Sequence, residues 1–126
     1  MKPRNRQERQ RARRRGIAAE TLCLWLLRLK GYRILARDLR TPVGEIDIVA
    51  RHGQTLVAVE VKRRGRMEDA ADAIGTAQRR RIQRALGWFA QRQPDGERLA
   101  MRFDAMLLGQ GALPRHIRDA WHGEVR

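Results

Sequence analysis

The chain has 126 residues, a length that suits one domain with one hydrophobic core. It holds 28 basic and 14 acidic residues, and the net charge of +14 predicts a polyanionic partner: nucleic acid first, an anionic membrane surface second. The single cysteine excludes an internal disulfide and no apolar run approaches the roughly 20 residues that span a bilayer, so we expect a cytoplasmic protein outside the membrane.

The first segment, residues 1–15, is strongly basic and almost without apolar side chains. It holds eight basic residues and one acidic residue. Blocks of like charge are usually disordered alone and often bind nucleic acid, so we expect a flexible tail at 1–15 and a single domain at 16–126. Part of the tail can extend the next helix, because Arg, Gln, Glu and Ala are tolerated there. The candidates for contacts with a nucleic-acid backbone are Arg13, Arg14 and Arg15, whose guanidinium groups grip phosphate at two points.

The next segment, residues 17–30, is predicted to form a largely buried helix. Apolar residues recur at helical spacing on most of its sides, as expected of a helix packed into a core. Gly31 is expected to end the helix, and residues 32–36 to form a first short strand. The apolar stripe consists of Leu22, Cys23, Leu26 and Leu29, widened by Leu24, Trp25 and Leu27.

Two further strands, residues 45–51 and 55–62, are predicted on either side of a turn at Gly53-Gln54. A glycine there supplies the positive φ of a type II′ hairpin. With these two turn residues, positions equidistant from the turn pair, so Asp47 is expected to face Glu60, with Cβ atoms about 4.5–5.5 Å apart. The alternating apolar residues of both strands are expected in the core: Ile46, Ile48 and Ala50, then Val57, Val59 and Val61.

The acids of this hairpin form the candidate site. Asp47 opposite Glu60 destabilises the sheet unless a cation lies between the carboxylates, and such a pair suits a hard divalent cation. Lys62 points to the same face as Glu60, where it can orient an attacking water or stabilise the charge that develops on phosphorus. The periodicity leaves an alternative open: a solvated strand face with surface ion pairs, such as Glu45 with Lys62.

The second half of the chain is predicted to contain a helix at 69–91, a strand at 101–108 and a short edge strand at 115–122. The first three strands can pair as an antiparallel meander, whereas the strands on either side of the second helix should be parallel. These elements predict an α/β domain with a mixed central sheet of four to five strands flanked by helices. The basic residues near the apolar stripe of the second helix are Arg79, Arg80 and Arg81.

Other polar residues are assigned structural or surface roles. Asp104 lies within an apolar strand, where we expect it to pair with Arg102 or cap a neighbour. The histidines have no partners at metal-ligand spacing and are expected on the surface: His52, His116 and His122.

Two motifs of the hairpin carry a resemblance. The sequence GEIDIVA at 44–50, followed by VEVKRR at 59–64, resembles the central signature of the PD-(D/E)XK nuclease superfamily. It resembles more closely the YraN-like family of small bacterial proteins. The likeness runs from Gly16 onward and includes the segments 16–20, 31–35 and 102–104. It implies a restriction-endonuclease-like core.

The resemblance also implies roles for individual residues. Asp47 matches the metal-binding aspartate of the superfamily, Glu60 the acid of its (D/E)XK element and Lys62 its lysine. Gln78 stands where the YraN-like pattern usually has Lys, and is a candidate accessory residue. Further candidates are the acids Glu20, which resembles a helix-borne acid of some members, and Glu45, together with Arg63 and Arg64 for contacts with the nucleic-acid backbone.

The leading hypothesis is therefore a metal-dependent endonuclease that hydrolyses phosphodiester bonds in nucleic acid, with DNA favoured over RNA. Its implied cofactor is Mg²⁺ or Mn²⁺, held by Asp47 and Glu60. Two alternatives keep the same fold without turnover: a nucleic-acid-binding module, and a partner protein of a DNA-processing complex. The attraction between the basic chain and phosphate supports these alternatives equally well.

Overall fold

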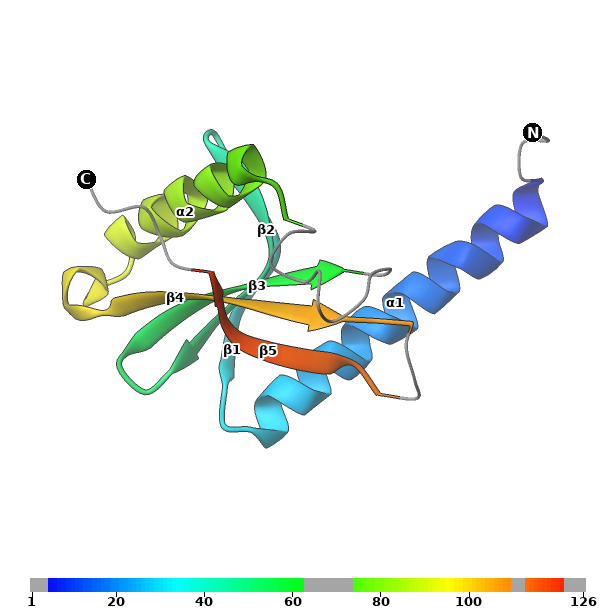
Figure 1. Cartoon of the computed structure of the whole chain (residues 1–126), viewed down its shortest axis with the longest axis horizontal. Coiled ribbons are helices and arrows are strands. Elements are labelled where there is room, and N and C mark those ends of the chain that lie inside the picture. Colours follow the sequence, from blue (N-terminus) through cyan, green and yellow to red (C-terminus); the bar gives the residue numbers. More distant parts are fainter. Residues whose placement is uncertain (1–4, 63–73, 110–112, 122–126) are drawn as a thin grey trace.

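The computed structural model describes residues 5–62, 74–109 and 113–121, in which helices pack against one sheet (Figure 1). In chain order, the elements are α1 (Arg6–Leu29), β1 (Arg33–Thr41), β2 (Gly44–His52), β3 (Thr55–Lys62), α2 (Thr76–Gln91), the short 3-10 helix η2 (Gly96–Arg98), β4 (Ala100–Leu107) and β5 (Arg115–Trp121).

The five strands form one mixed sheet in the order of the chain, β1-β2-β3-β4-β5. Neighbouring strands are antiparallel except β3 and β4, which are parallel because the connection through α2 returns the chain to the same end of the sheet. The predicted meander, parallel crossover and final edge strand are thus confirmed. The fold is α/β with helices flanking a mixed sheet, consistent with a restriction-endonuclease-like core.

Each face of the sheet has its own apolar core. On one face, residues of α1 such as Leu24 and Leu27 pack against Ile48 and Val59. On the other face, Ile82 and other residues of α2 pack against the sheet. Figure 1 shows α1 and α2 on opposite sides of the strands. Both faces of the central strands are therefore buried. The residues of β2 and β3 in the core beneath α2 are Ile46, Val49, Leu56 and Ala58.

Helix α1 is longer than its apolar stripe predicts. It begins at Arg6 rather than near residue 17, so the backbone of residues 6–15 is helical, as the helix-tolerant composition of that segment allows. The division of the chain into a tail and a domain at residue 15 stays a prediction. The helix ends at Leu29, and Gly31, whose φ is 91°, terminates it as expected. There the N–H groups of Gly31 and Tyr32 donate to the carbonyls of Arg28 and Leu27 at 3.0 and 2.9 Å.

Helix α2 begins at Thr76 in the structure. Gly75 before it is extended, with φ −63° and ψ 158°, and the first residues of the predicted helix lie outside the described residues. Strand β1 runs on to Thr41, beyond the predicted end at residue 36. None of the helices that the structure describes is long and apolar enough to cross a membrane.

Candidate functional site

The predicted register of the β2–β3 hairpin is confirmed. Gly53 has a φ of 62°, and the paired residues run from His52 with Thr55 to Ile48 with Val59. The ladder ends there, one step before Asp47 and Glu60, although β3 continues to pair with β4 as far as Lys62. Strands β2 and β3 therefore separate at the position of the two acids.

Asp47 marks a change in the path of β2. Ile46 belongs to the core beneath α2, whereas Ile48, two residues later, belongs to the core beneath α1. Residues two apart in a regular strand share a face, so the strand must rotate at Asp47. The β1–β2 register also passes over Asp47, next to Asp38, whose φ of 47° is unusual for a residue other than glycine. The Asp47 carboxylate bridges the separated strands by accepting the N–H of Val61 at 2.8 Å.

Glu60 lies on β3 beside the point where β2 and β3 separate, and it is only 8% exposed. Burial, together with a hydrogen bond and the charge of the neighbouring Asp47 carboxyl, raises the pKa of Glu60 to about 9, although Lys62 acts in the opposite direction. Its Oε2 atom is buried and has no hydrogen-bond partner among the described residues. The alternative of a solvated strand face is therefore wrong for Glu60: its buried carboxyl meets the half-buried carboxyl of Asp47.

The other residues predicted around this pair lie at different depths. Lys62 is half-buried on β3 and acts electrostatically on Glu60. Glu45 is exposed and 4.0 Å from the guanidinium of Arg40. Together with Gln78 it lines a hollow of about 400 Å³ between the β1–β2 turn and α2. The remaining residues of this hollow are Thr41, Gly44, Arg81 and Ile82.

The described residues bring no third acidic side chain to Asp47 and Glu60. Glu20 is half-buried on α1. Among residues 5–62, 74–109 and 113–121, no group of three or more His, Cys, Asp or Glu side chains is arranged to hold a metal ion. Asp47 and Glu60 therefore form a two-carboxyl site, which leaves most positions around a cation to water or to substrate oxygens.

The arginines predicted to contact a nucleic-acid backbone have different surroundings. Arg79 donates from Nε to the carbonyl of Ile74 at 2.8 Å, so it supports the entry into α2. Arg80 and Arg81 are exposed on α2. Of the other predicted arginines, Arg13, Arg14 and Arg15 belong to α1. Arg63 and Arg64 lie outside the described residues.

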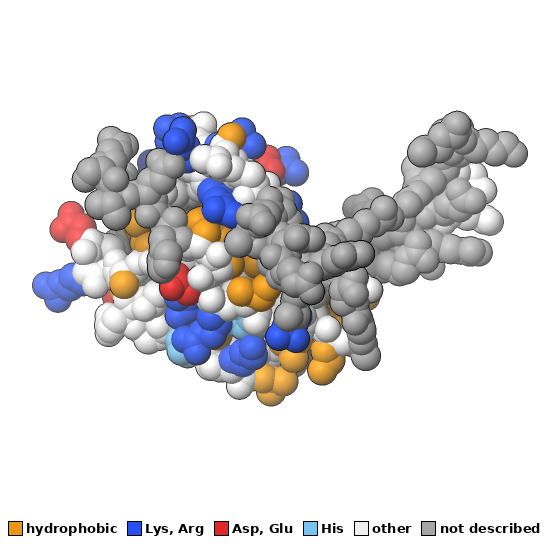
Figure 2. Space-filling model, in the orientation of Figure 1, with side chains coloured by type: hydrophobic (Ala, Val, Ile, Leu, Met, Phe, Trp, Pro, Cys, Tyr) orange, Lys and Arg blue, Asp and Glu red, His pale blue; other side chains and the backbone are white. Residues whose placement is uncertain are grey.

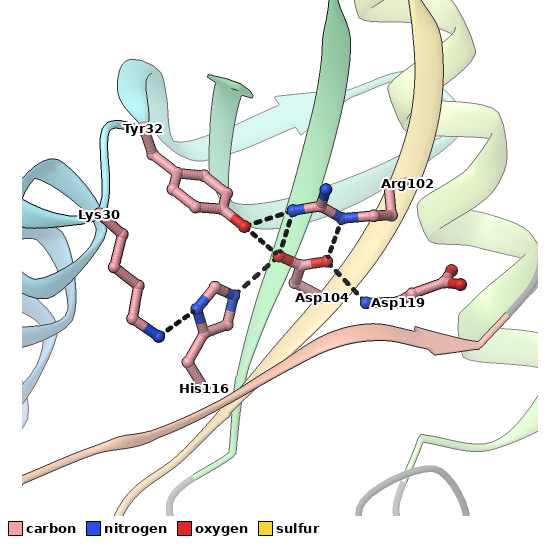
Figure 3. Close-up of polar contacts among 6 residues, drawn as sticks. All are labelled: Lys30, Tyr32, Arg102, Asp104, His116 and Asp119. Atoms are coloured by element: carbon pink, nitrogen blue, oxygen red, sulfur yellow. Dashed lines mark hydrogen bonds and ion pairs between the residues drawn. The ribbon is translucent and has the colours of Figure 1, made fainter. Parts of the chain in front are cut away.

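A second buried polar cluster surrounds Asp104 on the α1 side of the sheet (Figure 3). The fully buried carboxylate accepts from Arg102 Nε and Nη2 at 2.8 and 3.0 Å, and from the Tyr32 hydroxyl at 3.2 Å. It also accepts from His116 Nε2 at 2.7 Å and from the Asp119 N–H at 3.0 Å. Burial alone would raise the pKa of Asp104, but these donors, His116 first among them, hold it well below its usual range. The predicted structural role of Asp104 with Arg102 is confirmed.

The prediction that the histidines lie on the surface is wrong for His116. Its side chain is only 2% exposed, and it accepts a hydrogen bond from Lys30 Nζ at Nδ1, 2.9 Å away. Because a lysine ammonium can only donate, Nδ1 must be the acceptor and Nε2 must carry the proton shared with Asp104. His52 is half-buried and stacks on Tyr32 with ring centroids 4.5 Å apart. His122 lies outside the described residues.

Sequence comparisons place these features in a family. The model of the Uncharacterised protein family UPF0102, which is the YraN family, matches residues 19–108 and thus includes both acids and Lys62. A UPF0102 protein of Parvibaculum lavamentivorans is 50% identical over 108 residues, which are 86% of this chain and 81% of the relative. One of Mesorhizobium japonicum is 47% identical over 91% of this chain and 92% of its own length. The resemblance drawn from the two hairpin motifs is confirmed.

Proposed function

Because this chain belongs to the uncharacterised protein family UPF0102, whose name states no activity, we propose its function from the geometry: a metal-dependent endonuclease that hydrolyses phosphodiester bonds in nucleic acid. The observation that carries the proposal is the meeting of Asp47 and Glu60 where β2 and β3 separate, with Glu60 Oε2 left without a hydrogen-bond partner among the described residues. A folded chain has little reason to bury one carboxyl against another unless something cationic joins them.

The residues at the pair fit a divalent cation. Two carboxyl groups supply hard oxygen ligands, and Lys62 lowers the pKa of Glu60 by less than burial and Asp47 raise it. The N–H of Val61 fixes one oxygen of Asp47, so the carboxylate is already oriented. We propose that Asp47 and Glu60 hold Mg²⁺ or Mn²⁺, which when bound polarises a phosphoryl oxygen and makes water more acidic.

In the proposed reaction, a water oxygen adds to phosphorus and one phosphorus–oxygen ester bond breaks. A proton of the water passes to the departing oxygen, so the products are a phosphomonoester end and a hydroxyl end. Lys62 lies two residues after Glu60 on β3, where its ammonium group orients this water or stabilises the charge on the phosphoryl oxygens. The net charge of +14 favours binding of the polyanionic substrate, and DNA is proposed ahead of RNA.

Metal binding is tested by thermal denaturation with and without Mg²⁺ or Mn²⁺. We expect either cation to raise the melting temperature of the wild-type protein and to have no such effect on Asp47→Asn or Glu60→Gln. Glu97→Gln, which removes an exposed acid from η2, is the matched control and should respond like the wild type. A shift of the same size in Glu60→Gln would show that the cation binds elsewhere.

Turnover is tested on a panel of linear, flapped and four-way-junction DNA and the corresponding RNA. We expect wild-type protein to cleave at least one substrate with Mg²⁺ or Mn²⁺, and Asp47→Ala to bind that substrate without cutting it. If pure wild-type protein cleaves none of them with either ion, the endonuclease proposal fails.

A second candidate is a nucleic-acid-binding module or partner protein without turnover. The absence of a third acidic ligand within the described residues favours it. Calorimetric titration with Mn²⁺ separates the two functions: no binding to wild-type protein that still binds nucleic acid supports the module. Under either function we propose a cytoplasmic protein, since the one cysteine, Cys23, is a buried free thiol, as expected in a reducing compartment.

A further inference from the structure

Trp25 is exposed on the surface of α1 although several residues close to it in the chain are buried. Its exposed fraction is 58%, whereas Cys23, Leu24 and Leu27 are at most 3% exposed. The sequence stripe predicts a core position, but the helix turns this indole outward. Tryptophan is the largest apolar side chain and is usually mostly buried, so its exposure beside Leu29, which is 80% exposed, calls for a ligand.

A basic group lies beside this ring. The Arg28 guanidinium lies 5.7 Å from the centre of the Trp25 ring. Figure 2 shows hydrophobic and basic side chains next to each other near the end of α1 that meets the sheet. An exposed aromatic ring with cations beside it is the combination by which proteins bind single-stranded nucleic acid: the cations attract the phosphates and the ring stacks on a base.

We propose that Trp25 is a stacking platform for an unpaired base, so that the chain acts on nucleic acid with a single-stranded stretch. The inference rests on the proposed function and specifies its substrate. A duplex hides its base faces in the stack, whereas an unpaired base presents one to the ring. A second copy of the chain is a poor occupant of this surface, because two chains of net charge +14 repel each other.

The platform and the acid pair are linked through the same hairpin. Leu24 and Leu27, on the buried side of α1, pack in one cluster with Ile48 and Val59. These two residues are the chain neighbours of Asp47 and Glu60. A strand held on the outer side of α1 therefore binds to the helix that packs against the hairpin residues next to the two acids, so a junction between paired and unpaired nucleic acid is the substrate that suits both features.

The test measures binding of a fluorescein-labelled oligothymidylate and of a fully paired duplex by anisotropy, in EDTA so that nothing is cleaved. We expect Trp25→Ala to bind the single strand at least about fivefold more weakly than wild type, and Trp25→Phe to retain most of the affinity. Duplex binding should be unchanged in both. The matched control is Leu29→Ala, which removes another exposed apolar side chain of the same helix without an aromatic ring.

Salt dependence and fluorescence supply readouts that a merely structural role would not move. Trp25→Ala should leave the slope of affinity against salt unchanged, whereas Arg28→Gln should reduce its magnitude by about 0.7, the value for one phosphate contact on a single strand. The oligothymidylate should quench tryptophan fluorescence in the wild type and much less in Trp25→Phe. Circular dichroism melts check that each variant is folded.

Three outcomes overturn the inference. The first is that Trp25→Ala binds the oligothymidylate as tightly as the wild type does. The second is that Trp25→Ala loses as much affinity for the duplex as for the single strand. The third is that Leu29→Ala loses as much affinity for the oligothymidylate as Trp25→Ala does while the wild type binds phosphatidylglycerol vesicles. In that case the surface binds a membrane. The endonuclease proposal has a separate test. If binding depends on Trp25 but nothing is cleaved, the stacking platform is supported and the endonuclease proposal fails. If the protein cleaves but binding does not depend on Trp25, only the endonuclease proposal is supported.

Discussion

At the level of single residues, Glu60 is held protonated across neutral pH in the folded, metal-free chain, because its pKa is raised from 4.5 to about 9. The folded state then binds a proton that the unfolded state has released, so stability falls as pH rises from about 4.5 towards 9. This direction is opposite to that of an ordinary ion-paired carboxylate.

The first prediction concerns Glu60→Gln. With metal chelated, we expect this variant to be more stable than the wild type at about pH 8, by about 1–3 kcal/mol, because the neutral amide is not forced to ionise. The difference should shrink towards about pH 5, because so close to the ordinary pKa of 4.5 the unfolded state gains little by releasing the Glu60 proton. Urea denaturation at the two pH values measures it, and a wild type that is equally stable at both would contradict the raised pKa.

The second prediction concerns Asp104→Asn. The change removes the charge that Arg102 and His116 contact in a buried place, so we expect a loss of about 2–4 kcal/mol near neutral pH. The low pKa of the wild-type carboxyl stabilises the fold above the usual pKa of aspartate and is lost as pH falls, so the gap between the proteins should narrow in acid. Chemical denaturation measures the loss of stability near neutral pH and its decrease in acid. Asp95→Asn, which breaks the partly exposed Arg51–Asp95 pair, is the control and should lose less stability.

At the level of helices and strands, Gly44 permits a close approach between β2 and α2. A Cβ atom at this position would lie 2.6 Å from the carbonyl oxygen of Arg81. A backbone atom cannot move aside cheaply, so a side chain here would push the helix away from the turn beside the acid pair. Gly87 lies inside α2 with open space around its Cβ position.

The third prediction compares alanine at these two glycines. We expect Gly44→Ala to lower stability by about 1–3 kcal/mol through overpacking. Gly87→Ala should raise stability by up to about 1 kcal/mol, because alanine is the better helix former. Thermal melts of both variants check this, and a Gly44→Ala protein as stable as the wild type would show that α2 shifts without cost.

Local patterns predicted the central hairpin well and the first helix less well. Strand β3 has the predicted bounds, since its alternation and the glycine turn before it are signals within a few residues. The start of α1 was missed because residues 6–15 have no apolar stripe, and helix formation there depends on propensity alone. The exposure of Trp25 was missed too, because the stripe is apolar on most sides and does not show which side the sheet covers.

The two polar centres differ in how far the sequence reveals them. Asp47 and Glu60 lie one step beyond the β2–β3 ladder, so the hairpin register is enough to predict that they lie near each other. The cluster around Asp104 joins Tyr32 and His116, which come from elements far apart in the chain, and no local pattern connects them. The burial of Glu60 also depends on the whole fold, because α2 must cover that face of the sheet.

For the whole molecule, the net charge of +14 predicts binding to nucleic acid that weakens steeply with salt. Residues 1–15 supply eight basic residues against one acidic residue. Figure 2 shows further basic side chains over α2 and along the lower part of that face. Residues 1–15 and the rest of the chain are therefore both expected to contribute to the affinity for nucleic acid, and the two contributions can be measured separately.

The fourth prediction replaces Arg13, Arg14 and Arg15 with glutamine, which removes three charges while keeping helix-tolerant residues. We expect the slope of log affinity against log salt to decrease in magnitude by about 2–3 on duplex DNA, with the melting temperature unchanged. Fluorescence anisotropy over a salt series measures it. An unchanged slope would mean that these three arginines do not contact the DNA backbone.

The strand order has a consequence for how the chain folds. Each described strand pairs with its neighbour in the chain, so most of the sheet can form by closing short loops, which is fast. The long step joins β3 to β4 across residues 63–99, and parallel pairing must wait until that loop closes. Substitutions in the β2–β3 hairpin should therefore slow folding, whereas those in β5, which we expect to dock after β4, should mainly speed unfolding.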